Sequence, residues 1–374
     1  MGRGGMVASS QPLATAAGLE MLRRGGNAAD AAVATAAALN VTEPLSTGIG
    51  GDMFALFFDA GSRRISALNG SGRAPAALTL ERLRQEGIDG LPPDHPYTVT
   101  VPGACAGWCD LLARHGTLPL AEVLAPAIRL AEEGFPVAPV AAYFWQLGAQ
   151  WPLESSLNGR ELTLDGRGPE PGEIFRNPNL ARTLRRLAEG GPQVFYQGDI
   201  GEAIVATVRQ AGGCLTVEDL AEHTSTWETP ISTTYAGLRL WECPPNGQGI
   251  TALIALNLVE GFDLLSLDPV SADRVHLEIE ALRLAFADAR WYVADPQLHP
   301  VPVEELLSKD YAARRSRLIN RRRATLDQHH GASVTGESVI SHASEGMITS
   351  TASPFFRTGL AMGWTNIANS GYRA

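Results

Sequence analysis

Residues 28–40 constrain the fold more than any other part of the sequence. This segment holds eight alanines and almost no polar residue, and the preceding Gly25-Gly26-Asn27 is typical of the end of one helix before the next begins. A helix that is apolar on nearly every side has to be buried, and alanine side chains let neighbouring backbones approach closely. We therefore expect the chain to fold around a buried helix at residues 28–40.

The composition is that of a globular protein. The chain has 374 residues, of which 45% are hydrophobic and 19% charged, so it can bury a large core and is not globally disordered. The formal net charge of −10 argues against nucleic acid as a partner. Lys309 is the only lysine, and it lies in a charged stretch that we expect at the surface. We interpret Arg321-Arg322-Arg323 as a solvated helix end.

Cysteine usage and hydropathy indicate the compartment. Four cysteines, Cys105, Cys109, Cys214 and Cys243, are too few and too scattered for a disulfide scaffold, so we expect buried, reduced thiols. No apolar run approaches the roughly 20 residues of a membrane span, and no apolar leader follows Met1. These features predict a cytoplasmic protein that contacts no membrane, or a periplasmic one if a leader has been removed.

Periodicity predicts a mixed α/β fold. The expected helices lie at residues 13–24, 28–40, 79–87, 104–114, 120–133, 180–189, 202–211, 218–222, 250–260 and 272–294. The expected strands lie at 53–58 and 64–68, which pair as a hairpin, at 98–101 and at 233–241, while 144–176 is turn-rich. We expect one domain over residues 1–330, followed by an atypical tail at 331–374 that has no acidic residue after Gly346.

Common catalytic and binding motifs are not matched. Gly48-Ile49-Gly50-Gly51-Asp52 resembles a phosphate loop, but Met53 stands where the third glycine belongs, and the expected helix precedes the loop. These glycines either pack a strand against the alanine-rich helix or form a backbone wall beside a substrate site. His276, Glu278 and Glu280 are spaced by two on one helix and point to different faces, so they cannot share a metal. We expect no metal and no cofactor.

An ordered set of short blocks carries a family resemblance. The blocks lie at residues 7–14, 25–34, 43–51, 101–107, 116–119, 125–135, 260–263, 276–288 and 295–296. Each block is modest by itself, but their order resembles the large subunit of the γ-glutamyltranspeptidase family over about four fifths of the chain.

The resemblance implies a fold and a mechanism. Members of that family are N-terminal-nucleophile hydrolases with stacked α, β, β and α layers, and one precursor cleaves itself into a large and a small subunit. The new N-terminal threonine attacks a γ-glutamyl amide such as that of glutathione, and its own α-amino group, with a pKa near 8, takes the proton. The acyl group then passes to water or to an amine.

One departure concerns substrate binding. The family places an arginine in an Arg-x-x-Ala-Pro pattern, where it holds the α-carboxylate of the substrate. In this sequence Ser71 occupies that position, and Arg73 follows two residues later. Arg73 either reaches the same carboxylate by another backbone path or is a structural loop residue, and the acyl group is either γ-glutamyl or a relative such as glutaryl.

The second departure concerns the small subunit. All matched blocks belong to the large subunit, and Thr349-Ser350-Thr351, the nearest hydroxyl cluster, does not resemble the nucleophile strand. The catalytic residue is therefore not identified, and we expect a chain that is inactive alone. A change of reading frame near residue 335 is one explanation. The alternatives are a truncated remnant, a scaffold that needs a separate small chain, or a small-molecule binding protein outside this family.

Overall fold

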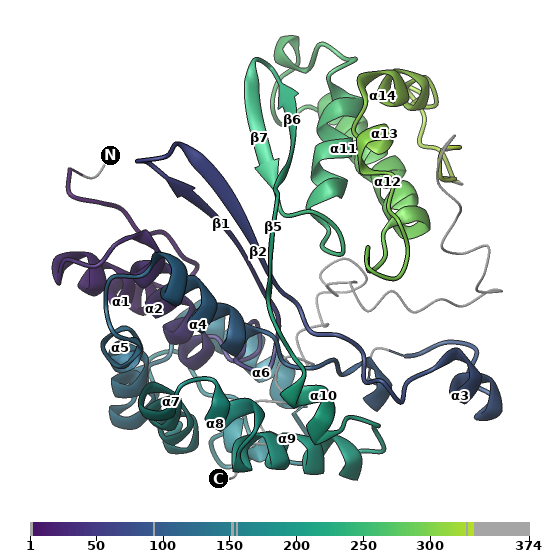
Figure 1. The fold of residues 1–374 in the computed structure, drawn as a ribbon. Coiled ribbons are helices and arrows are strands. Elements are labelled where there is room, and N and C mark those ends of the chain that lie inside the picture. The colour runs from purple at the N-terminus through teal and green to yellow at the C-terminus, as the bar shows by residue number, and fades with distance from the viewer. Residues whose placement is uncertain (1–2, 93, 151–152, 155, 327, 333–374) are drawn as a thin grey trace. The chain divides into compact units, whose positions relative to one another are not determined.

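The computed structural model describes residues 3–332, except residues 93, 151–152, 155 and 327. The chain divides into two compact units, and the divisions fall within strands (Figure 1). Among the described residues, the first unit comprises the chain up to Phe54 and Leu68–Thr226, and the second comprises Ala55–Ala67 and residues 227–332. The tail at 333–374, with Thr349 and Thr351, lies outside the described residues.

The first unit is mainly helical. Its helices are α1 (Pro12–Arg23), α2 (Ala28–Thr42), α3 (Leu80–Gln85), α4 (Ala104–His115), α5 (Leu120–Glu133), α6 (Pro139–Gln150), α7 (Pro178–Gly190), α8 (Gln193–Tyr196), α9 (Asp199–Gln210) and α10 (Val217–Ala221). The short strands β3 (Phe135–Pro136) and β4 (Ile174–Phe175) pair antiparallel. Most of the helices expected from periodicity are confirmed within a few residues of their predicted bounds.

Helix α2 is the predicted buried helix. Eleven of its fifteen residues are buried, and it packs against α1, α4 and α5. Small residues allow the close approach: a Cβ added at Gly18 of α1 would lie 2.3 Å from the Thr35 hydroxyl oxygen of α2. The helix that constrains the fold in the sequence is thus the centre of the first unit.

A buried carboxylate fixes the start of α2. Asp30 is fully buried and accepts hydrogen bonds from the backbone N–H of Asn27 (2.8 Å), from the backbone and hydroxyl of Thr117 (3.0 and 2.7 Å) and from the backbone of Leu118 (3.2 Å). Burial acts to raise the pKa of Asp30, but these donors outweigh it and hold the pKa below its usual value. The ionised carboxylate therefore joins α2 to the turn after α4.

The turn-rich segment predicted at residues 144–176 starts too early, since residues 144–150 belong to a helix, but turns and a 3₁₀ helix do occupy most of the described residues from 153 to 173. Helix α6 runs through residue 150, because Ala142 and Trp145 lie on a face that is buried in the first unit. The Trp145 indole N–H donates to the Leu162 carbonyl at 2.6 Å. Tertiary burial of this face outweighs the weak local signal for a helix.

A three-stranded sheet has the order β1–β2–β5, formed by β1 (Met53–Asp59), β2 (Arg64–Gly70) and β5 (Thr226–Glu228). The β1–β2 hairpin confirms the prediction. The strand expected at 98–101 is wrong: a 3₁₀ turn occupies Pro96–Thr98, and the Val101 N–H makes a single backbone bond to Arg73 rather than joining a ladder.

The second unit combines a hairpin with helices. Strands β6 (Ile231–Tyr235) and β7 (Leu238–Glu242) pair antiparallel, and α11 (Gly249–Val259), α12 (Ala272–Tyr292), α13 (Val303–Leu306) and α14 (Lys309–Ser316) follow. The single strand predicted at 233–241 is wrong. Ala236 and Gly237 both have positive φ, 48° and 79°, which reverses the chain in the middle of that segment. Because alanine is uncommon in that conformation, the turn has no strong sequence signal.

Lys309 is not a simple surface residue. Its side chain is 48% exposed, but its ammonium group donates to the Thr234 carbonyl, the Asn257 amide oxygen and the Glu260 carboxylate, each at 2.6 Å. The one lysine of the chain thus joins β6, α11 and the start of α14 in the second unit.

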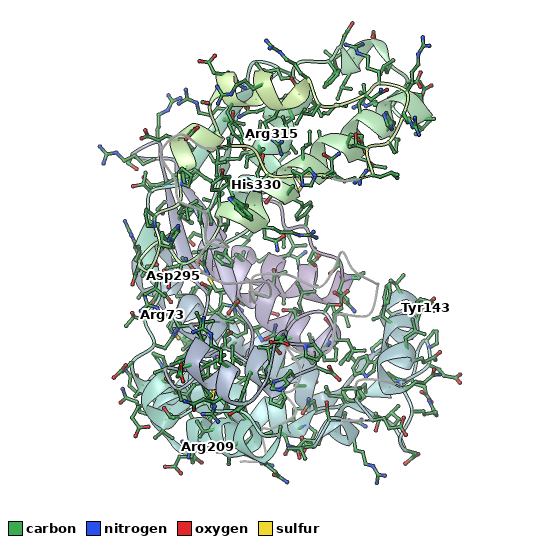
Figure 2. The ribbon with its side chains drawn as sticks, turned by 90° about the vertical axis from the view of Figure 1, so that its right-hand side faces the viewer. Arg73, Tyr143, Arg209, Asp295, Arg315 and His330 are labelled. Carbon is green, nitrogen blue, oxygen red and sulfur yellow. The ribbon has the colours of Figure 1, made fainter. Side chains whose placement is uncertain are left out.

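Residues 320–326 and 328–331, here called the strap, lie along α12 and α14 without regular structure. Arg315 and Asp288 form a buried ion pair at 2.9 Å, Arg315 also donates to the His329 carbonyl, and Asp288 accepts from the Gly331 N–H at 2.7 Å. Tyr292 donates to the Gly331 carbonyl. The His330 ring stacks on Trp291 with centroids 3.7 Å apart. Figure 2 marks Arg315 and His330, the two strap contacts at this end of α12 and α14.

No helix among the described residues is long and apolar enough to cross a membrane. Cys105, Cys214 and Cys243 are buried, as expected, whereas Cys109 is only half-buried.

Candidate active site

Arg73 lies in an irregular loop that follows β2 (Figure 2). The Asn69 amide oxygen accepts from the Ser71 backbone (3.0 Å) and hydroxyl (2.7 Å), which turns the chain at the end of the strand. The Arg73 carbonyl then accepts from the Val101 N–H at 2.9 Å. This bond joins the two ends of the segment 73–101, which contains α3, and these joined ends are here called the base of the Arg73 loop. The Arg73 side chain is exposed.

Glycines permit the tight contact at this base. A Cβ at Gly72 would lie 1.5 Å from the Val101 carbonyl oxygen, and one at Gly103 would lie 2.1 Å from the Gly70 carbonyl oxygen. Both distances are far below a normal van der Waals contact, so any side chain would force the backbones apart. The position of Arg73 therefore depends on glycine at these two places.

The glycine-rich loop at 48–52 supports the same base. The Gly51 carbonyl accepts from the N–H groups of Gly103 (3.0 Å) and Ala104 (2.8 Å) at the start of α4, and Asp52 accepts from the Gly72 N–H at 2.9 Å. These bonds fasten the loop to the start of α4 and to the loop after β2, and both interpretations of its glycines stay predictions. Residues 51–52, 70–73 and 101–104 thus form one fixed backbone constellation.

Tyr196 and His223 add two side chains that the sequence analysis did not single out. The buried Tyr196 hydroxyl donates to the Pro102 carbonyl at 2.7 Å and accepts from the Ala106 N–H at 3.0 Å. The His223 ring stacks on Tyr196 with centroids 5.4 Å apart. No local motif marks either residue, because their partners are about 90 and 30 positions away in the chain.

The positive charge of Arg73 is one of three influences on the pKa of His223. Burial is the main cause that lowers the pKa of His223, and the positive charge of Arg73 acts in the same direction, while Asp110 opposes them. His223 is therefore neutral at neutral pH, where its imidazole can act as a hydrogen-bond partner without adding a positive charge.

The thiols of this region are not activated. Burial raises the pKa of Cys105 and of Cys214, and it raises the pKa of Cys243 in the second unit to about 11. Since the thiolate is the nucleophilic form, these cysteines are poor candidates for covalent catalysis.

The three residues of α12 weighed as metal ligands have separate partners. His276 contacts the Asn320 carbonyl at 2.7 Å, Glu278 pairs with Arg274 at 2.9 Å, and Glu280 binds Arg283 at 2.7 Å and the Thr325 N–H at 3.0 Å. Each of these side chains is thus used to hold the helix or the strap.

The side chain that this constellation presents has a chemistry suited to carboxylates. An exposed guanidinium on a rigid backbone base offers a paired donor set that matches the two oxygens of a carboxylate. The one hydroxyl among these residues, that of Ser71, donates to Asn69 at 2.7 Å, and the hydroxyl cluster considered as a nucleophile lies outside the described residues.

Comparison with known proteins identifies the family. The family model for gamma-glutamyltranspeptidase matches residues 14–371. The chain belongs to this family. The match includes most of residues 331–374. The predicted boundary between a domain at 1–330 and an atypical tail at 331–374 stays a prediction.

Individual relatives agree with this assignment. The chain is 36% identical over 313 residues to the glutathione hydrolase-like YwrD proenzyme of Bacillus subtilis (strain 168), covering 82% of this chain and 58% of that protein. It is 45% identical to the solved cephalosporin acylase from Bacillus halodurans, with a TM-score of 0.76 over 86% of this chain and 62% of that one.

A third relative is the gamma-glutamyltranspeptidase of Helicobacter pylori, which is 30% identical with a TM-score of 0.79, over 87% of this chain and 95% of that chain. These likenesses confirm the predicted fold class, the large-subunit part of an N-terminal-nucleophile hydrolase. The chain spans about three fifths of the length of the curated relatives it matches first.

Proposed function

We propose that this chain is the large-subunit portion of an acyl-amide hydrolase or transferase of the gamma-glutamyltranspeptidase family. A small-subunit portion completes it and supplies an N-terminal threonine after self-cleavage. Arg73 binds the free carboxylate of the acyl donor. The observation that carries this proposal is the rigid backbone constellation that presents Arg73, formed by Gly51, Gly72, Val101 and Gly103.

The proposed acyl group has a carboxylate at the end remote from the amide bond. Both γ-glutamyl and glutaryl groups meet this condition, since they differ only in an α-amino group. Arg73 stands two residues beyond the position that the family resemblance assigns to the arginine. The identity to the cephalosporin acylase, 45% against 30% for the H. pylori enzyme, supports keeping acyl groups other than γ-glutamyl among the candidate donors. The free cysteines fit a reducing compartment such as the cytoplasm.

The chain by itself is expected to be inactive, because the described residues that surround Arg73 bind and position but do not attack. This distinguishes the proposal from a simple binding protein, which would take up the acyl donor and never turn it over. A non-catalytic remnant would do neither.

The test compares two chromogenic anilides, γ-glutamyl and glutaryl, on the full chain with and without a co-expressed small-subunit portion. That portion is taken from the B. halodurans cephalosporin acylase, as the part that follows the residues matched here. Release of the aniline by the pair, but not by either chain alone, is the expected result. Intact mass measured in parallel reports the length of each chain and any self-cleavage.

Substitution of Arg73 tests its role in this assay. Arg73→Ala should lower kcat/KM by about 100-fold, the equivalent of about 3 kcal/mol for a lost charged pair, chiefly through KM. Arg84→Ala, which removes an exposed arginine of α3, is the matched control and should change kcat/KM less than twofold. Equal activity of the Arg73→Ala and wild-type pairs would show that Arg73 is a structural loop residue.

A further inference from the structure

A strongly basic segment begins in the last turn of α14 and continues into the strap. Residues 314–323 include six arginines and no acidic residue. Arg315 is buried and pairs with Asp288, so its charge is used inside the second unit. The other five are exposed and are here called the arginine patch: Arg314, Arg317, Arg321, Arg322 and Arg323. Five of ten consecutive residues therefore present a positive charge to solvent.

Neighbouring carboxylates do not neutralise the arginine patch. The ion pairs nearest to it in the chain and on α12 use Arg274, Arg283 and Lys309 instead. Among the described residues, no ion pair includes an arginine of the patch, and Asp310, the acidic residue of α14, pairs with none of them. The five guanidinium groups therefore keep their full charge for another partner.

Contacts within the second unit hold the patch in place. The Arg314 guanidinium lies 5.7 Å from the centroid of the Tyr311 ring, and that of Arg321 lies 5.1 Å from the centroid of the Phe262 ring. The Asn320 amide oxygen accepts from the next two backbone N–H groups but one, at 2.9 and 3.2 Å, which turns the strap at residues 322–323. Binding to this surface therefore requires less ordering than binding to a free arginine-rich chain would.

Unpaired like charges at this spacing repel one another. The backbone of residues 321–323 spans less than one Debye length, which is about 10 Å at 0.1 M salt, so salt screens their repulsion incompletely. An anionic group that binds across these residues removes this repulsion and gains attraction from each of them. The patch is therefore suited to a partner that carries several negative charges close together.

The charge of the rest of the chain limits the size of that partner. Guanidinium groups match both carboxylates and phosphates. Removing the five charges of the patch from the formal net charge of −10 leaves −15 for the remainder. A nucleic acid or a membrane surface extends beyond the patch and would also face this negative remainder. The two rings beside the patch lie under guanidinium groups and offer no platform for bases. A short acidic polypeptide fits best.

We propose that the arginine patch is a docking surface for a short acidic segment of another protein, whose Asp and Glu side chains pair with its guanidinium groups. Each guanidinium offers parallel N–H donors to the two oxygens of one carboxylate. Because the attraction acts between exposed charges, the affinity falls as the salt concentration rises. This inference goes beyond the proposed function and does not depend on it.

The test measures binding of an acidic peptide to the full chain. A fluorescent peptide of alternating glutamate and serine is titrated at low salt, and its anisotropy gives Kd. The triple variant Arg321→Gln, Arg322→Gln and Arg323→Gln should raise Kd at least about tenfold, because three charge pairs are lost. Raising the salt concentration should weaken wild-type binding and reduce the difference between the two proteins.

A second triple variant controls for net charge. Arg84→Gln, Arg160→Gln and Arg290→Gln remove the same total charge at scattered exposed residues and should change Kd less than about twofold. All six substituted side chains are exposed, so both variants should keep the wild-type circular dichroism spectrum and the wild-type midpoint of urea denaturation. These two measurements separate a lost docking surface from a lost fold.

Four outcomes would overturn the inference. Two are an unchanged Kd in the first triple variant and equal binding of a peptide with glutamine in place of glutamate. The third is tighter binding of a single-stranded oligonucleotide or a phosphatidylserine vesicle than of the acidic peptide, since the partner would then carry phosphate. The fourth is loss of peptide binding when the small-subunit portion is present, which would show that this portion occupies the patch. Retained binding in that mixture is the expected result.

Discussion

The Arg73 loop and the strap are both irregular segments held in one conformation, but they are held in different ways. The base of the Arg73 loop is fixed by backbone hydrogen bonds and by glycines that admit no side chain. The strap is fixed by side chains of α12 and α14, with a buried ion pair at its end. The conformation of the loop should therefore be disturbed by adding a side chain at its glycines. The stability of the strap should instead be lowered by removing a charged group of its ion pair.

The largest expected effect is the loss of the strap's ion pair. Asp288→Ala leaves Arg315 charged and unpaired in the core of the second unit and removes the acceptor for Gly331. The free energy of unfolding should fall by about 4 kcal/mol, as is typical when one partner of a buried pair is removed. Urea denaturation measures this loss. Glu278→Ala, at an exposed pair on the same helix, should cost less than about 0.5 kcal/mol.

Added volume should affect the Arg73 loop next. Gly72→Ala places a Cβ against the Val101 carbonyl, so the loop must shift, at a cost of about 2 kcal/mol. In the two-chain assay this variant should also raise KM, since Arg73 moves with the backbone. Gly61→Ala is the control, because its Cβ would meet its nearest atom at an ordinary 3.5 Å. If Gly72→Ala matched Gly61→Ala in both readouts, glycine would not be required at residue 72.

The smallest effect is a difference in pH dependence between two buried aspartates. The pKa of Asp30 is lowered by its donors, so its stabilising contribution is complete above its usual pKa and is lost as the pH falls through the folded-state value. The pKa of Asp288 is raised by burial, against the opposing effects of Arg315 and Gly331. Protonated Asp288 therefore contributes to the free energy of unfolding at low pH, and this contribution is lost as the pH rises through the folded-state pKa of Asp288.

Denaturation curves at a series of pH values test this contrast. The deficit of Asp30→Asn relative to wild type should shrink as the pH falls below about 4, the usual range for an aspartate. The deficit of Asp288→Asn should instead shrink as the pH rises above that range. Parallel pH profiles for the two variants would contradict the assigned directions.

Local signals predict much of this fold and part of the site. The alanine content of residues 28–40 predicts the buried helix α2, and two strand-length runs separated by turn residues predict the β1–β2 hairpin. Both elements form as expected. The turn at Ala236 does not, because alanine gives no warning of a positive φ. Arg73 is found through its place in a sequence pattern, and its role stays a prediction.

Contacts between residues far apart in the chain cannot be predicted from local sequence patterns. Tyr196 contacts Pro102 across 94 positions, and Asp288 contacts Gly331 across 43. Neither pair has a characteristic spacing, and the value of each contact depends on burial that only the folded chain provides. Sequence patterns therefore locate the segments of the site but not the side chains that hold them together.

The single lysine has a practical consequence. Amine-selective acylating reagents can modify only one side chain in this chain, and the Lys309 ammonium must first leave its three acceptors, which are Thr234 of β6, Asn257 of α11 and Glu260 just after α11. The rate at which the peptide containing Lys309 gains the reagent's mass therefore reports how often this corner of the second unit opens. The wild-type chain carries its own chemical probe of local unfolding, and no label has to be engineered into it.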